Sequence, residues 1–183
     1  MYRKLLYYSE RRDLIEFHFE TTYDQNALKA MARALRKTVH KKRSRRSTTF
    51  GCLTILLGLL LLFSAAEINP RVIITAAAVT AVMFALLFQD DLNGHIAGKR
   101  SMPGLNKAVT IFHESGYHSI AAIGESDFPY HNILLLAEDK KYFIFIFSTH
   151  HGQIYDKSSL TGGSLTEFMD FLSEKTGKEW LYI

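Results

Sequence analysis

The longest apolar pattern in the chain is a pair of uncharged stretches, residues 48–66 and 72–88. At about 1.5 Å of rise per residue, the first stretch reaches close to the ~30 Å hydrocarbon thickness of a bilayer, and the second lies at the lower edge of spanning length. A soluble helix keeps a polar stripe, whereas residues 53–63 are Leu, Ile and Phe apart from one Thr and one Gly. The pattern predicts a transmembrane helical hairpin over residues 48–88 that turns at Asn69-Pro70.

The segment before the hairpin predicts one strand and one helix. Apolar and polar residues alternate over Ile15–Thr21, as in a half-buried strand. A helix capped by Thr22 or Asp24 follows, and we expect it to run on toward the first span. Nothing else in this piece covers the apolar face of the strand, so the strand is expected to join a sheet formed by the C-terminal piece. The apolar positions of the helix are Leu28, Met31, Ala32, Leu35 and Val39.

Beyond residue 104, short apolar runs separated by turn residues predict an antiparallel sheet. Glu114-Ser115-Gly116 suits a hairpin turn, and residues 124–129 are expected to form a loop. The run Phe143–Phe147 is apolar on both faces, so other elements must pack on both faces of its strand. The last helix is the candidate for the second face. The predicted strands are Val109–His113, Tyr117–Ile123, Tyr130–Ala137, Lys141–Phe147 and Gln153–Tyr155.

A closing helix follows the strands. Ser164 and Glu167 form a capping box at its start, and Gly177 ends it. One face of this helix is apolar, through Leu165, Phe168, Met169 and Leu172.

These elements predict a membrane protein that combines a two-helix transmembrane hairpin with an α+β cytoplasmic domain, a small antiparallel sheet closed by a C-terminal helix. Residues 1–47 supply the N-terminal strand and a basic amphipathic helix. The spans are residues 48–66 and 72–88, and residues 104–183 form the β-rich domain with its C-terminal helix.

The charge pattern sets the expected orientation. The net charge is only +4, but residues 29–46 are rich in Lys and Arg and contain no acid, whereas the loop between the two stretches has one Arg and one Glu. Basic residues beside a spanning helix stay cytoplasmic and are attracted to anionic headgroups, by about 1 kcal/mol each. We therefore expect a multi-pass protein of the cell membrane with both termini cytoplasmic. The membrane-surface basic cluster is Lys41, Lys42, Arg43, Arg45 and Arg46.

The basic segment has two other interpretations. Nucleic-acid binding is disfavoured, because no aromatic residue lies between Ala27 and Thr49. A solvated helix face remains an alternative for Lys29–Lys37.

Small residues in the two spans favour close helix packing. Gly51 and Gly58 share one face of the first span, and Ala77, Ala81 and Ala85 recur at every fourth position of the second. The expected partner is the other helix of the hairpin, with a homodimer as the alternative. Neither span contains Asp, Glu, Lys, Arg or His, which disfavours a transporter.

Catalytic chemistry finds little support in the sequence. The histidines of the tail lack the spacing that aims two rings at one metal, and the single Cys52 lies within the apolar run. We expect no metal, no cofactor and no enzyme, with a histidine-based site as the minor alternative. The histidines in question are His113, His118, His131, His150 and His151.

Several segments resemble the YcxB-like family of bacterial membrane proteins. These are the strand FHFETTYD, the two adjacent spans, the tail FPYHNILLLAEDKKYFIFIFSTHHGQIYDKSSL and the helix GSLTEFMDFLSEKTG. Members often carry proline before the lysine that corresponds to Lys157, where this chain has Asp156. The arrangement is also similar to bacterial pleckstrin-homology-like (PH-like) domains on paired spans. The resemblance implies this architecture and no established activity.

The sequence thus favours a small PH-like binding module held at the inner leaflet. Its expected partners are anionic headgroups, an unknown protein or a second copy, with Lys140, Lys141 and Lys157 as further headgroup contacts. A structural protein that acts through its spans is the alternative, and a membrane-anchored enzyme is a second one.

Overall fold

The computed structural model describes residues 16–65, 67–100 and 107–183, and of Arg100 only the backbone. The predictions for Ile15 and the rest of residues 1–15, for Ala66 at the end of the first span, and for residues 104–106 lie outside this part of the chain.

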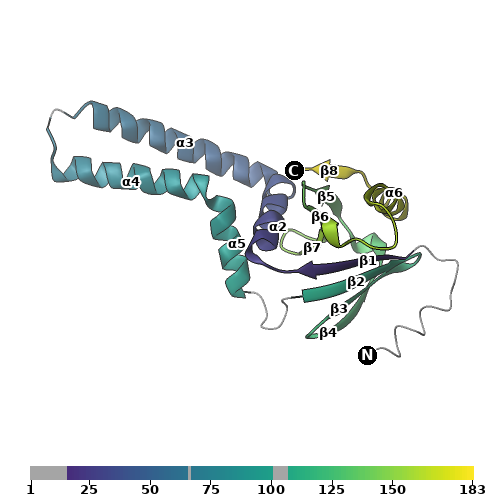
Figure 1. The fold of residues 1–183 in the computed structure, drawn as a ribbon. Helices are drawn as coiled ribbons and strands as arrows, with labels where there is room; N and C mark the ends of the chain where they lie inside the picture. Colours follow the sequence, from purple (N-terminus) through teal and green to yellow (C-terminus); the bar gives the residue numbers. More distant parts are fainter. Residues whose placement is uncertain (1–15, 66, 101–106) are drawn as a thin grey trace.

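Two long helices form a hairpin that projects from one end of the molecule (Figure 1). They are α3 (Lys41–Phe63) and α4 (Pro70–Leu87). Asn69 caps α4 by accepting hydrogen bonds from the backbone N–H groups of Arg71 and Val72, and Pro70 occupies the first helical turn, where its missing N–H costs nothing. The hairpin prediction is confirmed as a pair of antiparallel helices, with α3 beginning in the basic cluster.

A second helix pair lies between the hairpin and the sheets (Figure 1). It consists of α2 (Gln25–Lys37), capped by the Asp24 side chain, and α5 (Gln89–Arg100). The helix predicted to run on toward the first span ends at Lys37, and three turn residues separate it from α3. Thr38 caps this end of α2, and its backbone (φ −107°, ψ −91°) is not helical. The N–H group and the hydroxyl group of Thr38 both donate hydrogen bonds to Ala34 O. The sequence pattern did not predict α5.

The first sheet is antiparallel, in the order β1-β2-β3-β4. Its strands are β1 (Phe17–Thr22), β2 (Lys107–His113), β3 (Gly116–Ala121) and β4 (Gly124–Phe128). The pairing of β1 with β2 confirms that the N-terminal strand joins the C-terminal sheet, so all four helices α2 to α5 are inserted between two neighbouring strands. The loop predicted at residues 124–129 is wrong over β4, whose mostly polar, exposed residues carry no apolar alternation.

The second sheet has the order β7-β6-β5-β8 and ends the chain. The predicted strand at residues 130–137 begins instead as a 3₁₀ turn, η1 (Tyr130–Asn132). The last strand, β8, was not predicted and runs parallel to β5. The elements are β5 (Leu135–Glu138), β6 (Tyr142–Ile146), β7 (Gly152–Asp156), η2 (Lys157–Ser159), α6 (Leu165–Thr176) and β8 (Trp180–Tyr182).

Strand β6 is buried on both faces, as predicted, because two helices cover it. Phe143 and Phe145 pack in an aromatic core with β1 and α6. Ile144 and Ile146 face the opposite way, against the alanine face of α2. Helix α6 starts at the predicted capping box and ends at Gly177, in the left-handed conformation (φ +66°). The last helix therefore covers only one face, and α2, the helix nearest the hairpin, covers the other.

Candidate membrane-facing surface

The outer surface of the α3–α4 hairpin is apolar. Both helices are long and apolar enough to cross a membrane, and only 11% and 6% of their most hydrophobic windows are buried. The core helix of a soluble protein is mostly buried, so these helices are not hidden by the rest of the described chain. The large side chains at least half exposed on them are Phe50, Leu53, Leu56, Leu57, Leu60, Leu61, Phe63, Ile73, Ile74, Phe84 and Leu87.

The two hairpin helices touch through glycine on α3 and larger residues on α4. A Cβ at Gly51 would lie 2.8 Å from Leu86 Cδ1, and one at Gly58 would overlap Val79. Gly51 and Gly58 therefore pack within the hairpin, as predicted. The second half of that prediction is wrong, because Ala77, Ala81 and Ala85 are exposed on the outside of α4. The seam on α4 follows Val79 and Leu86, which are spaced like the two glycines opposite them.

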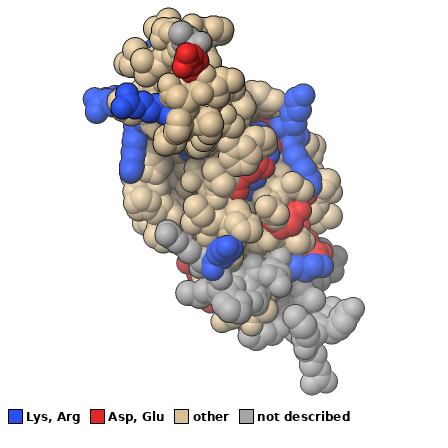
Figure 2. Space-filling model, turned by 90° about the vertical axis from the view of Figure 1, so that its left-hand side faces the viewer, with Lys and Arg blue, Asp and Glu red and all other residues tan. Residues whose placement is uncertain are grey.

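The predicted basic cluster, Lys41, Lys42, Arg43, Arg45 and Arg46, forms the first turns of α3 at the base of the hairpin. All five side chains are exposed, and within the described part of the chain no ion pair involves them. Figure 2 views the molecule from the hairpin end and shows Lys and Arg side chains standing out on either side of a largely uncharged face. The cluster therefore presents free positive charge where the apolar surface begins.

The basic residues of α2 have a different environment. Arg36 makes two hydrogen bonds to the carboxylate of Asp90 on α5, from Nε (2.6 Å) and Nη2 (2.8 Å). Arg33 lies 3.5 Å from the same carboxylate, and Lys29 lies 2.5 Å from Asp91. These three side chains are therefore partly exposed and ion-paired to α5. Their partners are too distant in sequence for a local charge pattern to reveal. The solvated face stays a prediction for Lys29–Lys37.

The pKa of Asp90 reflects this pairing. Burial by itself raises the pKa of the carboxyl group, but the hydrogen bond from Arg36 and the positive charges of Arg36 and Arg33 outweigh burial and bring the pKa below its ordinary value of 3.8. Asp90 is therefore ionised at neutral pH, and it joins α5 to α2 directly below the hairpin.

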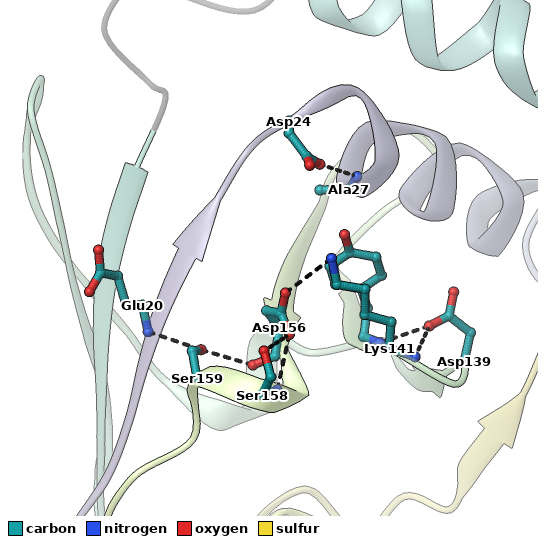
Figure 3. Close-up of polar contacts among 9 residues, drawn as sticks. Glu20, Asp24, Ala27, Asp139, Lys141, Asp156, Ser158 and Ser159 are labelled. Atoms are coloured by element: carbon teal, nitrogen blue, oxygen red, sulfur yellow. Dashed lines mark hydrogen bonds and ion pairs between the residues drawn. The ribbon is translucent and has the colours of Figure 1, made fainter.

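The further predicted lysine contacts lie beside the second sheet, Lys140 and Lys141 in the turn between β5 and β6 and Lys157 in η2. Lys157 Nζ is 2.5 Å from Glu138 Oε2 and 2.7 Å from Asp139 O, and it lies over the Phe143 ring, so its donors are used within the fold. Lys141 Nζ lies 3.4 Å from Asp156 (Figure 3). Of the three, Lys140 is the exposed side chain for which the structure records no such contact.

Asp156, which precedes Lys157, holds the start of η2 by hydrogen bonds. Its carboxylate accepts bonds from Ser158 N (3.0 Å) and Oγ (2.6 Å), and Ser159 in turn joins Asp156 O to Glu20 N (Figure 3). Asp156 has φ −74°, a value that proline also adopts. The side chain therefore caps η2 with the backbone conformation that a proline would impose.

The tail histidines contact different partners. His118 Nδ1 lies 2.7 Å from Asp127, His113 lies 3.3 Å from Glu16, and His151 contacts Ser148. The rings of His150 and His40 are tilted, with centroids 5.8 Å apart, and His131 is exposed. Among the described residues, no three His, Cys, Asp or Glu side chains are grouped to hold a metal ion. Cys52 is exposed on α3.

The fold and this surface define a class of protein: an α+β body of two sheets with a long apolar helical hairpin inserted after its first strand. The model of the YcxB-like protein family matches residues 112–172, from the end of β2 into α6, and so confirms the resemblance to that family over this segment. No curated protein and no solved structure matches the chain.

Proposed function

We propose that this protein is a multi-pass protein of the cell membrane that holds a small PH-like binding module at the inner leaflet, with both termini cytoplasmic and without catalytic activity. The observation that carries the proposal is the combination, at one end of the molecule, of an exposed apolar hairpin with an unpaired basic cluster at its base. Water would be a poor solvent for the hairpin, and an anionic leaflet would attract the cluster.

Strand order supports the PH-like part of the proposal. Four antiparallel strands, then three more and a closing helix, follow one another as β1 to β4, β5 to β7 and α6. The hairpin takes the place of the β1–β2 connection, and every strand lies at its basic end (Figure 1). A module attached in this way would remain close to the headgroups, which raises its effective concentration toward a lipid or protein partner.

Membrane extraction tests the proposal. Full-length protein should remain in the membrane fraction after an alkaline carbonate wash and be released by detergent, and a reporter fused after Ile183 should be active only in the cytoplasm. Release by carbonate alone, or an external reporter signal, would contradict it.

A second copy of the chain is a further candidate partner, because Ala77, Ala81 and Ala85 are exposed on α4 and leave room for another helix. With a thiol oxidant added and Cys52 replaced by Ser, Ala81→Cys should then form a disulfide-linked dimer in membranes, whereas Leu57→Cys, on α3, should not. Equal cross-linking of both variants would argue against this dimer.

A further inference from the structure

A cleft of about 690 Å³ opens where the two helix pairs meet, between α2, the start of α3, α5 and the β6–β7 loop. Its floor includes Leu28, Met31 and Leu35 of α2. Its polar lining includes Arg43, Ser44, Ser47, Gln89 and Asn93. His40 also lines the cleft, and its Nε2 donates to Thr149 O (2.8 Å), which joins the loop to the helix break.

The position of the cleft matches the surface of a bilayer. Ser47 directly precedes the uncharged part of the hairpin, and Gln89 directly follows it, so both ends of the apolar segment meet in one cleft. The apolar outer surface begins within one turn of Ser47, at Phe50, which is 73% exposed. A lipid with its headgroup in the cleft would therefore have its acyl chains beside the hairpin.

The charge of the cleft suits a single negative charge. Arg36 is neutralised by Asp90, whereas Arg43 has no ion pair within the described residues. The cleft is also lined by serine hydroxyl groups and by the amide groups of Gln89 and Asn93, which can donate to phosphate oxygens without adding charge, and by the imidazoles of His40 and His150. One unpaired guanidinium with neutral donors matches a phosphodiester better than it matches a multiply charged headgroup.

We propose that this cleft binds the phosphodiester headgroup of one monoanionic phospholipid, with Arg43 as the main charged contact. The inference rests on the proposed function, because it requires the hairpin to lie in a bilayer. It adds a specific lipid site to the general attraction of the basic cluster.

Native mass spectrometry of the full chain, released from detergent with added phosphatidylglycerol or phosphatidylcholine, tests this site. One phosphatidylglycerol should be retained preferentially. Arg43→Gln should weaken its apparent affinity about fivefold or more. Arg45→Gln removes the same charge from an exposed neighbour outside the cleft and should have a clearly smaller effect. Equal effects of the two variants, or equal retention of both lipids, would overturn the proposal.

A second pair of variants introduces charge. Asn93→Asp places a carboxylate in the cleft and should reduce phosphatidylglycerol retention, whereas His95→Asp, exposed on the same helix outside the cleft, should not. Retention unchanged by Asn93→Asp would count against the site. Added inorganic phosphate should not displace the lipid, and displacement would show a phosphate-ion site instead.

The two proposals fail in different ways. If carbonate releases the protein from membranes, the proposed function is wrong. If the protein stays in the membrane but retains the lipids without preference, only the headgroup site is wrong.

Discussion

The two antiparallel helix pairs, α2–α5 and α3–α4, pack alike and yet face different surroundings. Each has glycine at its closest approach: Gly94 against the backbone of Lys29, and Gly58 against Val79. In α2–α5 the remaining surface carries ion pairs and buries alanines against β6, whereas α3–α4 exposes leucine and phenylalanine. Close helix contact is therefore common to a pair with a charged outer surface and a pair with an apolar outer surface. The two pairs differ in the residues that point away from the contact.

The largest expected effect concerns the boundary between the two pairs. Replacing Lys41, Lys42, Arg43, Arg45 and Arg46 together with Gln should remove roughly 5 kcal/mol of attraction to an anionic leaflet, at about 1 kcal/mol for each residue. We expect a reporter after Ile183 to show mixed orientations in cells, with the sheets still folded. Lys140→Gln, a charge removed far from the hairpin, is the control. A uniformly cytoplasmic reporter signal from the variant with all five substitutions would contradict the role given to the cluster.

The glycines provide a direct contrast between the pairs. A Cβ at Gly94 would lie 3.0 Å from both Cα and N of Lys29, so Gly94→Leu must push α5 away from α2 and should cost about 1–3 kcal/mol. Fluorescence of Trp180, which packs on Phe143, follows unfolding of the sheets in detergent. Gly58→Leu should disturb the hairpin alone and leave the unfolding midpoint of the sheets unchanged. Equal shifts of this midpoint in the two variants would mean that the two helix pairs unfold together.

A smaller effect is expected at the ion pairs between α2 and α5. Asp90→Asn leaves Arg36 and Arg33 without their carboxylate in a partly buried position. It should lower the free energy of unfolding of the sheets by about 1–2 kcal/mol. Asp91→Asn removes a more exposed partner of Lys29 and should change stability by less than about 0.5 kcal/mol. Denaturant midpoints compare the two. A larger loss from Asp91→Asn would contradict the ranking of these contacts.

The smallest expected effect is a pH dependence confined to the same pair. The pKa of Asp90 is lowered in the folded protein. The ionised carboxylate therefore contributes fully to the free energy of unfolding above pH 3.8, its ordinary pKa, and this contribution is lost as the pH falls through the lowered pKa. The stability difference between wild type and Asp90→Asn should therefore shrink when the pH is lowered from 6 toward the lowered pKa. A difference that persists in strong acid would show that the charge of Asp90 is not its source.

Local patterns predicted much of the fold because the relevant contacts lie close in sequence. Ser164 and Glu167 are three residues apart, and the turn at Glu114-Ser115-Gly116 joins adjacent strands. The elements that were missed lack such a signal. Strand β4 is mostly polar, and β8 is only Trp180–Tyr182, held by parallel pairing with distant β5. The break at Thr38 also has no Gly or Pro to mark it.

Sequence alone determined the uncharged hairpin, the basic cluster beside it and the two-faced burial of β6, because hydrophobicity and charge are properties of the residues themselves. Tertiary structure decided which charges are free. Arg36 is neutralised by Asp90, 54 residues away, while Arg43, in the same basic run, stays unpaired at the mouth of a cleft. A carboxylate forms hydrogen bonds with a guanidinium only when the two groups are within about 3 Å, so Arg36 and Arg43 differ only once the chain has folded α5 against α2.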